Sequence, residues 1–212
     1  MAFLLRYAAA LLCAVALPLA AQANDVLAQV EQHCIQPGLD TAHFLTSPDG
    51  WTALAGHDLT DALTHAAIPN ALITATLQYG KREGDTAYDA TVRENRADRV
   101  DRTRADVADG QTVFMQHASG ARLMVKLGNG GWNFLECMLW HPDADADLHA
   151  AIMSRWAVAA PFNLQTPYGF QNDTSVYISL NNQPAELNAR IIRPSAKLAP
   201  TPVILMLETR PL

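Results

Sequence analysis

The alternation of hydrophobic and polar positions is clearest in residues 132–156, where a strand pattern runs directly into a helix pattern. Leu135, Cys137 and Leu139 share one face of the strand, and the residues between them are also mostly apolar. A strand that is apolar on both faces is typical of the centre of a covered sheet. From residue 148 onward, apolar positions recur at helical spacing. The stretch therefore predicts a central strand followed by a helix that packs on the sheet.

The same two patterns, alternation for strands and helical spacing for helices, predict the remaining elements of the fold. We expect further strands at residues 71–79, 88–92, 112–117, 122–127, 176–180, 187–191 and 203–207. We expect further helices at residues 24–34, 40–44 and 58–67. The sequence therefore predicts an α+β fold with a mainly antiparallel sheet of roughly seven to eight strands and three to four helices packed on it.

Two segments show neither the alternation of a strand nor the spacing of a helix, and they are predicted to lie outside the sheet. Arg93 to Asp109 contains five arginines and five acidic residues, with only Val100 and Val107 to bury. Such dense, balanced charge favours a solvated arm, with a partner-facing surface as the alternative. Residues 161–172 are predicted to form a long loop.

The first 23 residues have the pattern of an export signal. One basic residue, Arg6, precedes an apolar run from Tyr7 to Leu17, and Ala21 and Ala23 form a small-x-small cleavage site. The run is shorter than the roughly 20 apolar residues that a membrane span needs. We therefore expect residues 24–212 to form a single α+β domain in the periplasm or outside the cell, with no membrane span in the mature chain.

The charge balance narrows the range of partners. The chain has 15 basic and 21 acidic residues, for a net charge of −6, and no basic stripe. An acidic surface repels both nucleic acid and anionic membranes. We therefore expect neither as a partner.

Removal of the signal, which contains Cys13, leaves two of the three cysteines, Cys34 and Cys137. Both lie on apolar faces, one on a predicted helix and one on the central strand. In an exported protein an even pair of cysteines favours a disulfide. The alternative is two separate buried thiols.

Two clusters of polar residues suggest a metal ion, but neither has the full ligand pattern. Asp143, Asp145 and Asp147 alternate as in a calcium loop, yet that loop also needs Gly at its sixth position and Glu at its twelfth. The sequence has Leu148 and Ser154 there, so we interpret the acids as caps of the following helix.

The second cluster lies on the predicted helix at residues 58–67. His57, Asp61 and His65 share one face but would spread over about 12 Å, too far for one ion, so a solvated polar face is expected. Glu136 lies between two apolar residues of the central strand, where burial would raise its pKa as in a general acid. No partner at a recognisable spacing accompanies it, and we assign no catalytic residue, metal or cofactor.

Three aromatic residues, Phe162, Tyr168 and Phe170, lie in the predicted loop at residues 161–172. Aromatic side chains on a loop are typical anchors for recognition, although they also pack onto cores. The sequence thus favours a non-catalytic binding or interaction module of the bacterial envelope, with a protein or a small ligand as its partner. The alternative is an unrecognised hydrolase or metal-dependent enzyme that uses Asp61, His65, Glu136 or His141.

We predict signal cleavage after Ala23, because Ala occupies both the −1 and the −3 position directly after the apolar run. Mass spectrometry of the exported protein should find a chain that starts at Asn24. An intact Met1 or a lipid on Cys13 would contradict this prediction.

Overall fold

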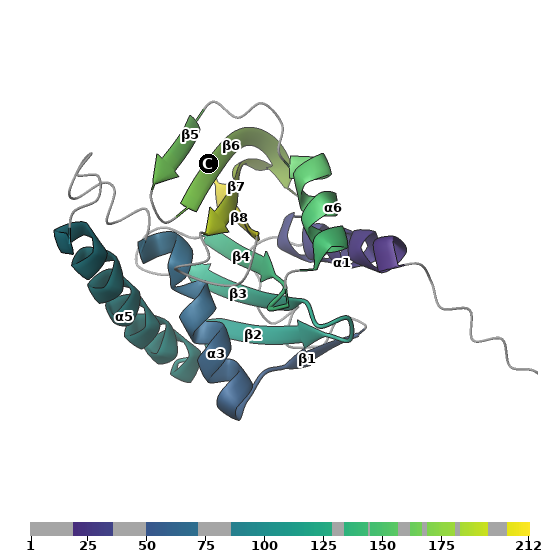
Figure 1. Ribbon diagram of the computed structural model, residues 1–212. Helices are drawn as coiled ribbons and strands as arrows, with labels where there is room; N and C mark the ends of the chain where they lie inside the picture. Colours follow the sequence, from purple (N-terminus) through teal and green to yellow (C-terminus); the bar gives the residue numbers. More distant parts are fainter. Residues whose placement is uncertain are drawn as a thin grey trace, which may run out of the picture.

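The computed structural model describes residues 19–35, 50–71, 86–128, 134–143, 145–156, 162–166, 169–180, 183–194 and 203–212. Within these residues, eight strands form one antiparallel sheet in the order β1-β2-β3-β4-β8-β7-β6-β5 (Figure 1). The strands are β1 (Trp51–Ala53), β2 (Thr112–His117), β3 (Arg122–Gly128), β4 (Phe134–Trp140), β5 (Phe162–Thr166), β6 (Gly169–Leu180), β7 (Gln183–Pro194) and β8 (Ile204–Pro211).

Two four-stranded meanders meet at the centre of this sheet. The first runs from β1 to β4, and the second runs from the far edge at β5 back to β8. β4 and β8 pair antiparallel, with Cys137 opposite Leu207. Every residue of β4 after Phe134 is buried, as the apolar character of both its faces predicts.

Four helices within the described residues cover both faces of the sheet. They are α1 (Leu19–Ile35), α3 (Gly56–Ala66), α5 (Thr86–Ala108) and α6 (Ala146–Trp156). Figure 1 shows α1 and α6 on one face and α3 and α5 on the other. The predicted α+β class is confirmed, with helices on both sides of an antiparallel sheet.

The face under α1 and α6 contains the larger hydrophobic core. Leu135, Leu139 and Leu205 of the sheet pack there against Val26 and Leu27 of α1 and Ile152 of α6. The predicted disulfide is present in this core. It joins Cys34 to Cys137, with 6.1 Å between the Cα atoms and a sequence separation of 103.

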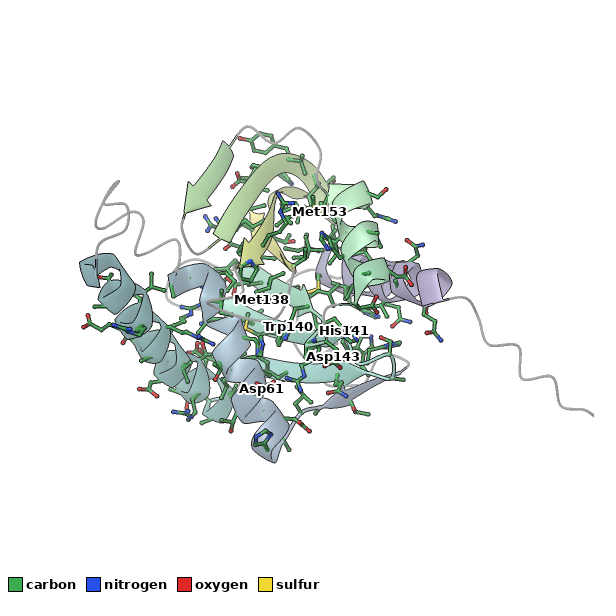
Figure 2. All side chains as sticks on the ribbon, in the orientation of Figure 1. Asp61, Met138, Trp140, His141, Asp143 and Met153 are labelled. Atoms are coloured by element: carbon green, nitrogen blue, oxygen red, sulfur yellow. A yellow bond between two sulfur atoms is a disulfide. The ribbon has the colours of Figure 1, made fainter. Side chains whose placement is uncertain are left out.

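The face under α3 contains a second core. Met138 and Trp140 of β4 pack there with Phe114 and with Leu63 of α3 (Figure 2). The rings of Phe114 and Trp140 meet edge to face, with 6.4 Å between their centroids. Because alternate β4 residues enter opposite cores, this strand fixes the position of both helix layers.

The predicted capping of α6 is also confirmed. Asp145 Oδ1 accepts hydrogen bonds from the backbone N–H groups of Asp147 and Leu148, at 2.9 and 3.1 Å. These are two of the free N–H groups that a helix N-terminus exposes. The acidic turn therefore begins the helix.

The prediction for the charged segment is wrong, because residues 86–108 form the 23-residue helix α5 and not a solvated arm. Arg102 and Arg104 pair with Asp98 and Asp101 at helical spacings of four and three. Such pairs stabilise a helix that is polar on most sides. The strand predicted at residues 88–92 is wrong for the same reason, since those residues belong to α5.

The long loop predicted at residues 161–172 is also wrong where the structure describes it. Residues 162–166 form β5, which pairs with residues 169–173 of β6. The helix predicted at residues 40–44 lies outside the described residues. So does the strand predicted at residues 71–79, apart from Ala71, which is helical. No helix in the described part of the chain is both long and apolar enough to cross a membrane.

Replacing Cys34 and Cys137 together by Ala should lower the free energy of unfolding by about 4 to 5 kcal/mol, because the bond closes a loop of about a hundred residues in the unfolded chain. Urea denaturation of the wild type and the double variant measures the difference. A reducing agent should lower the wild-type midpoint and leave that of the double variant unchanged. An unaltered wild-type midpoint under reduction would contradict the prediction.

Candidate functional site

A groove lies between α1 and α6, the two helices that cover the disulfide face of the sheet. Its volume is about 700 Å³, within the range of small-molecule sites. It is lined by Ala28, Glu31, Gln32, Ile35, Arg155 and Trp156. The walls thus combine apolar side chains with a few polar groups, as is usual in a binding site.

Glu31 is the central polar residue of this groove. Only 8% of the residue is exposed. Trp156 Nε1 donates a hydrogen bond to Glu31 Oε1 at 2.8 Å, and Arg155 lies 2.5 Å from Oε2. The carboxylate is therefore held by two neighbouring residues at the C-terminal end of α6.

The two ends of the Glu31–Arg155 ion pair have very different surroundings. The side chain of Glu31 is buried, whereas 59% of the Arg155 side chain is exposed. Burial raises the pKa of Glu31 above its ordinary value of 4.5, and Arg155 and the Trp156 hydrogen bond partly offset this rise. The groove thus contains a desolvated carboxylate whose counter-ion can move into solvent.

Sequence reasoning missed Glu31, although a signal for it was present. Glu31 lies four residues after Leu27 and three before Cys34, so it shares the predicted apolar face of its helix. A carboxylate at such a position is either paired or functional. Trp156 lies at the end of the predicted helix pattern, and its indole N–H orients the carboxylate.

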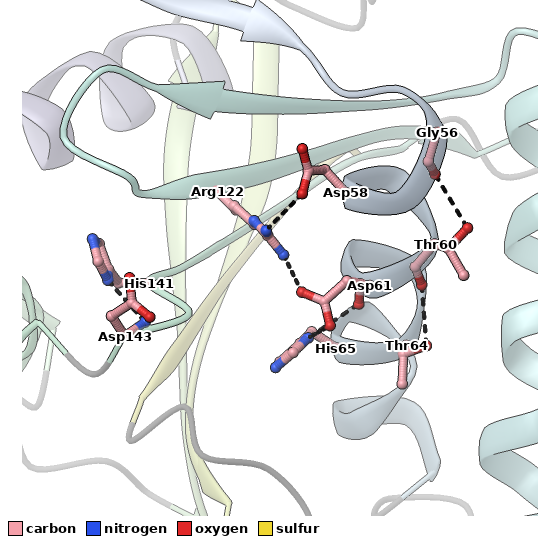
Figure 3. A network of polar contacts seen from close by, with 9 residues as sticks. All are labelled: Gly56, Asp58, Thr60, Asp61, Thr64, His65, Arg122, His141 and Asp143. Atoms are coloured by element: carbon pink, nitrogen blue, oxygen red, sulfur yellow. Dashed lines mark hydrogen bonds and ion pairs between the residues drawn. The ribbon is translucent and has the colours of Figure 1, made fainter.

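Figure 3 shows a second polar network, on the opposite face of the sheet. Arg122 of β3 pairs closely with Asp61 of α3 and lies 3.8 Å from Asp58. His65 Nδ1 lies 3.0 Å from the carbonyl oxygen of Asp61. This network joins α3 to the sheet.

The prediction that His57, Asp61 and His65 form a solvated polar face is wrong for His65. His57 is exposed, but His65 is buried, and its ring stacks on Trp140 with 6.4 Å between the centroids. The buried guanidinium of Arg122 neutralises the charge of Asp61. Asp61 and His65 therefore attach α3 to the sheet.

His141 lies at the end of β4, where it orders two turns. Its Nε2 lies 3.1 Å from the carbonyl oxygen of Ser119, and its Nδ1 accepts a hydrogen bond from the N–H of Asp143 at 3.1 Å. Within the described residues, no three His, Cys, Asp or Glu side chains gather in a group that could hold a metal ion.

Glu136, the predicted buried carboxylate, lies on the α5 side of the sheet. Only 5% of it is exposed, and its Oε1 has no hydrogen-bond partner among the described residues. Glu136 stands directly opposite Lys126 of β3 and Glu208 of β8 in the strand register. Lys126 in turn pairs with Asp106 of α5.

Burial raises the pKa of Glu136, and the charge of Glu208 raises it further. Three cations, Arg99, Lys126 and Arg190, act in the opposite direction. Burial is the largest of these effects, so the pKa of Glu136 is raised above its ordinary value of 4.5.

The residues considered for an enzyme are not brought together in one place. Glu136 and Trp140 are four residues apart on β4, which corresponds to about 13 Å along a strand. Asp61 and His65 lie at the Trp140 end. Glu136 is therefore separated from the other candidate residues.

Two of the three aromatic residues predicted to bind a partner, Phe162 and Phe170, belong to the hairpin formed by β5 and β6. The backbones of Phe162 and Phe170 belong to these two strands, and Phe162 pairs with Asp173. Tyr168 and the side chains of Phe162 and Phe170 lie outside the described residues. Their role in binding stays a prediction.

We predict that Glu136→Gln stabilises the protein relative to the wild type as the pH rises. A carboxyl group whose pKa is raised on folding stabilises the native state fully below its unfolded pKa, and this contribution is lost as the pH rises through the folded pKa. Glutamine carries no ionisable group, so the variant escapes that loss. Between pH 4 and pH 8 the variant should gain about 1.4 kcal/mol for each unit by which the folded pKa of Glu136 exceeds its unfolded pKa.

Urea denaturation at several pH values measures this difference between the variant and the wild type. Glu94→Gln, at an exposed position of α5, is the control and should show no such trend. A difference that stays constant with pH would contradict the raised pKa of Glu136.

Buried carboxylates are thus found at two places, in the groove between α1 and α6 and on the sheet face under α5. The first of these lines a groove that is open to a ligand. Compared with protein-family models, with curated proteins and with solved structures, the chain has no match.

Proposed function

We propose that this chain is an exported protein of the bacterial envelope that binds a ligand without changing it chemically. The groove between α1 and α6 is its binding site. The observation that carries the proposal is the buried carboxylate of Glu31, which shares the groove with an exposed counter-ion, Arg155. The export pattern of residues 1–23 and the disulfide between Cys34 and Cys137 support an oxidising compartment outside the cytosol.

The ligand carries a guanidinium or an ammonium group. A desolvated carboxylate gains most from a cation that it can both pair with and hydrogen-bond. In the structure the guanidinium of Arg155 fills this role from an exposed position. A ligand guanidinium would replace it at Glu31 and release Arg155 into solvent.

Trp156, Ala28 and Ile35 provide the apolar surface that such a ligand needs around its stem. Trp rings also attract cations through their electron-rich faces. A groove of about 700 Å³ accommodates an arginine or lysine side chain with one or two flanking residues. A short basic peptide therefore fits the site best.

The charge of the whole protein favours the same class of ligand. A net charge of −6 draws cations towards the surface and raises their association rate. This long-range attraction weakens as salt is added. Binding of a basic peptide in the groove should therefore be stronger at low ionic strength.

The buried carboxylate of Glu136 is the observation that favours the alternative function, an unrecognised hydrolase or metal-dependent enzyme. Its raised pKa and its position opposite Glu208 are properties of a general acid. Glu208, however, already pairs closely with Arg210 and lies 3.9 Å from Arg190. Ligand binding in the groove therefore remains the preferred function.

We predict that the tripeptide Gly-Arg-Gly binds the wild-type protein and that Gly-citrulline-Gly, which has the same shape without the charge, does not. Glu31→Gln should weaken binding by at least tenfold, because it removes a charge-assisted hydrogen bond. Arg155→Ala should strengthen binding about fivefold, because it removes the competing guanidinium of an exposed ion pair. Isothermal titration calorimetry at pH 7 and low salt measures all three affinities.

The pH dependence provides an independent check on Glu31. The ionised carboxylate is the form that binds, so the affinity should fall as the pH drops through the raised pKa of Glu31. Glu94→Gln makes the same charge change at an exposed position of α5 and should leave the affinity unaltered. Equal binding of both tripeptides, or a loss of affinity in Arg155→Ala, would overturn the proposal.

A further inference from the structure

Among the described strands, the outer edge of β6 is covered over only part of its length. β7 pairs with all of β6 from Gly169 to Leu180. On the other side, β5 pairs with residues 169–173 alone. Among the described strands, none pairs with the outer edge of residues 174–180.

Two of the three exposed large hydrophobic residues of the described chain lie on this open edge. Tyr177 is 79% exposed and Val176 is 42% exposed. The remaining large hydrophobic residue of this kind is Leu212, whose N–H donates to the carbonyl oxygen of Pro184 at the same end of the hairpin.

The sequence of the edge lacks the features by which proteins prevent strand pairing. Residues 174–180 read Thr-Ser-Val-Tyr-Ile-Ser-Leu, without a charge, a proline or a glycine. Edge strands are normally protected by charged side chains, proline or short length. β1, at the opposite edge of the sheet, has only three residues. The uncovered part of β6 is therefore suited to pair with another strand.

The edge is also chemically symmetric about Tyr177. On either side of that residue the chain reads valine or isoleucine and then serine. If two copies pair antiparallel around a two-fold axis at Tyr177, Val176 lies opposite Ile178 of the other copy and Ser175 lies opposite Ser179. The two pairs next to Tyr177 on each side thus join residues of the same kind, as a two-fold interface favours, and Thr174 meets Leu180 at the ends.

We propose that two copies of this chain associate through residues 174–180 of β6, antiparallel and centred on Tyr177, to form one continuous sheet. Main-chain hydrogen bonds hold the two copies together, and the side chains specify the register. The two Tyr177 rings form a cross-strand aromatic pair at the centre.

In the proposed dimer, the apolar face of the sheet in one copy continues as the apolar face in the other. Ile178 packs on the core under α1 and α6, and it stands opposite Ala185 of the same core face. The Val176–Ile178 pairs therefore extend the apolar face from one copy to the next. Tyr177 points to the other face, where its neighbour across β7 is Glu186.

The charges nearby are arranged so that two acidic molecules can meet there. The paired segment is itself uncharged, and the Glu186 carboxylate accepts a hydrogen bond from Ser175 Oγ at 2.7 Å. With a net charge of −6 on each copy, the remaining repulsion is screened by salt. The dimer should therefore be tighter at high ionic strength, whereas ligand binding in the groove should be weaker.

Analytical ultracentrifugation over a range of concentrations tests the association. The wild type should sediment as a dimer, and Tyr177→Lys and Tyr177→Glu should each raise the dissociation constant at least tenfold, because position 177 faces itself and like charges oppose each other. A mixture of the two variants should form the mixed dimer, since the two charges are then opposite. Only a register centred on Tyr177 predicts this recovery.

Cysteine cross-linking tests the same register by chemistry. Tyr177→Cys alone should form an intermolecular disulfide, since its Cβ atoms lie within cross-strand distance. Val176→Cys alone should cross-link poorly, but a mixture of Val176→Cys with Ile178→Cys should cross-link readily. The native pair of Cys34 and Cys137 is buried and already bonded, so the added cysteines are the free thiols in the described chain.

The control is Ala53→Lys, which adds the same charge at an exposed position of the opposite edge strand and should leave the dimer intact. Thermal unfolding checks that each variant is folded, as expected at an exposed position. A monomeric wild type at high concentration, or a dimer that Tyr177→Lys does not weaken, would overturn the proposal. A mixture of the lysine and glutamate variants that stays monomeric would overturn the register.

Discussion

The pairing of β4 with β8 is the interaction on which the rest of the structure depends, because it joins the two meanders and faces a helix layer on each side. Cys137 links this centre covalently to α1, while Met138 and Trp140 enter the core under α3. Most side chains of both strands are therefore buried. This explains why Glu208 pairs with Arg210 and why burial dominates the pKa of Glu136 directly opposite.

Much of the fold was predictable because an element that is buried on one or two faces has apolar residues at regular intervals in its sequence. The strands β2, β3 and β4 and the helix α6 were predicted with only small differences at their ends. α5 was not, because its first residues alternate like a strand and its remainder is balanced charge. Its helical state depends on ion pairs three and four residues apart and on contacts of Val100 and Val107 with the sheet, which a period does not reveal.

The candidate site was less predictable than the fold. The position of Glu31 on an apolar helix face was visible in the sequence, but its partners Arg155 and Trp156 are more than a hundred residues away and are brought near by the packing of α6 on α1. The reverse holds for His65 and Asp61. Their helical spacing suggested a shared polar face, whereas Arg122 and Trp140, from two different strands, determine what they do.

The groove and the open edge both follow from the way the chain crosses from the first meander to the second. After β4, α6 passes over the sheet and delivers the chain to the far edge, and the end of this helix supplies Arg155 and Trp156 to the groove. The strand that follows, β5, has five residues against the twelve of β6. It therefore covers the start of β6 and leaves residues 174–180 without a neighbour among the described strands. A β5 of full length would close that edge without altering the groove. The two surfaces therefore both depend on the path of the chain through α6, but they have no residue in common.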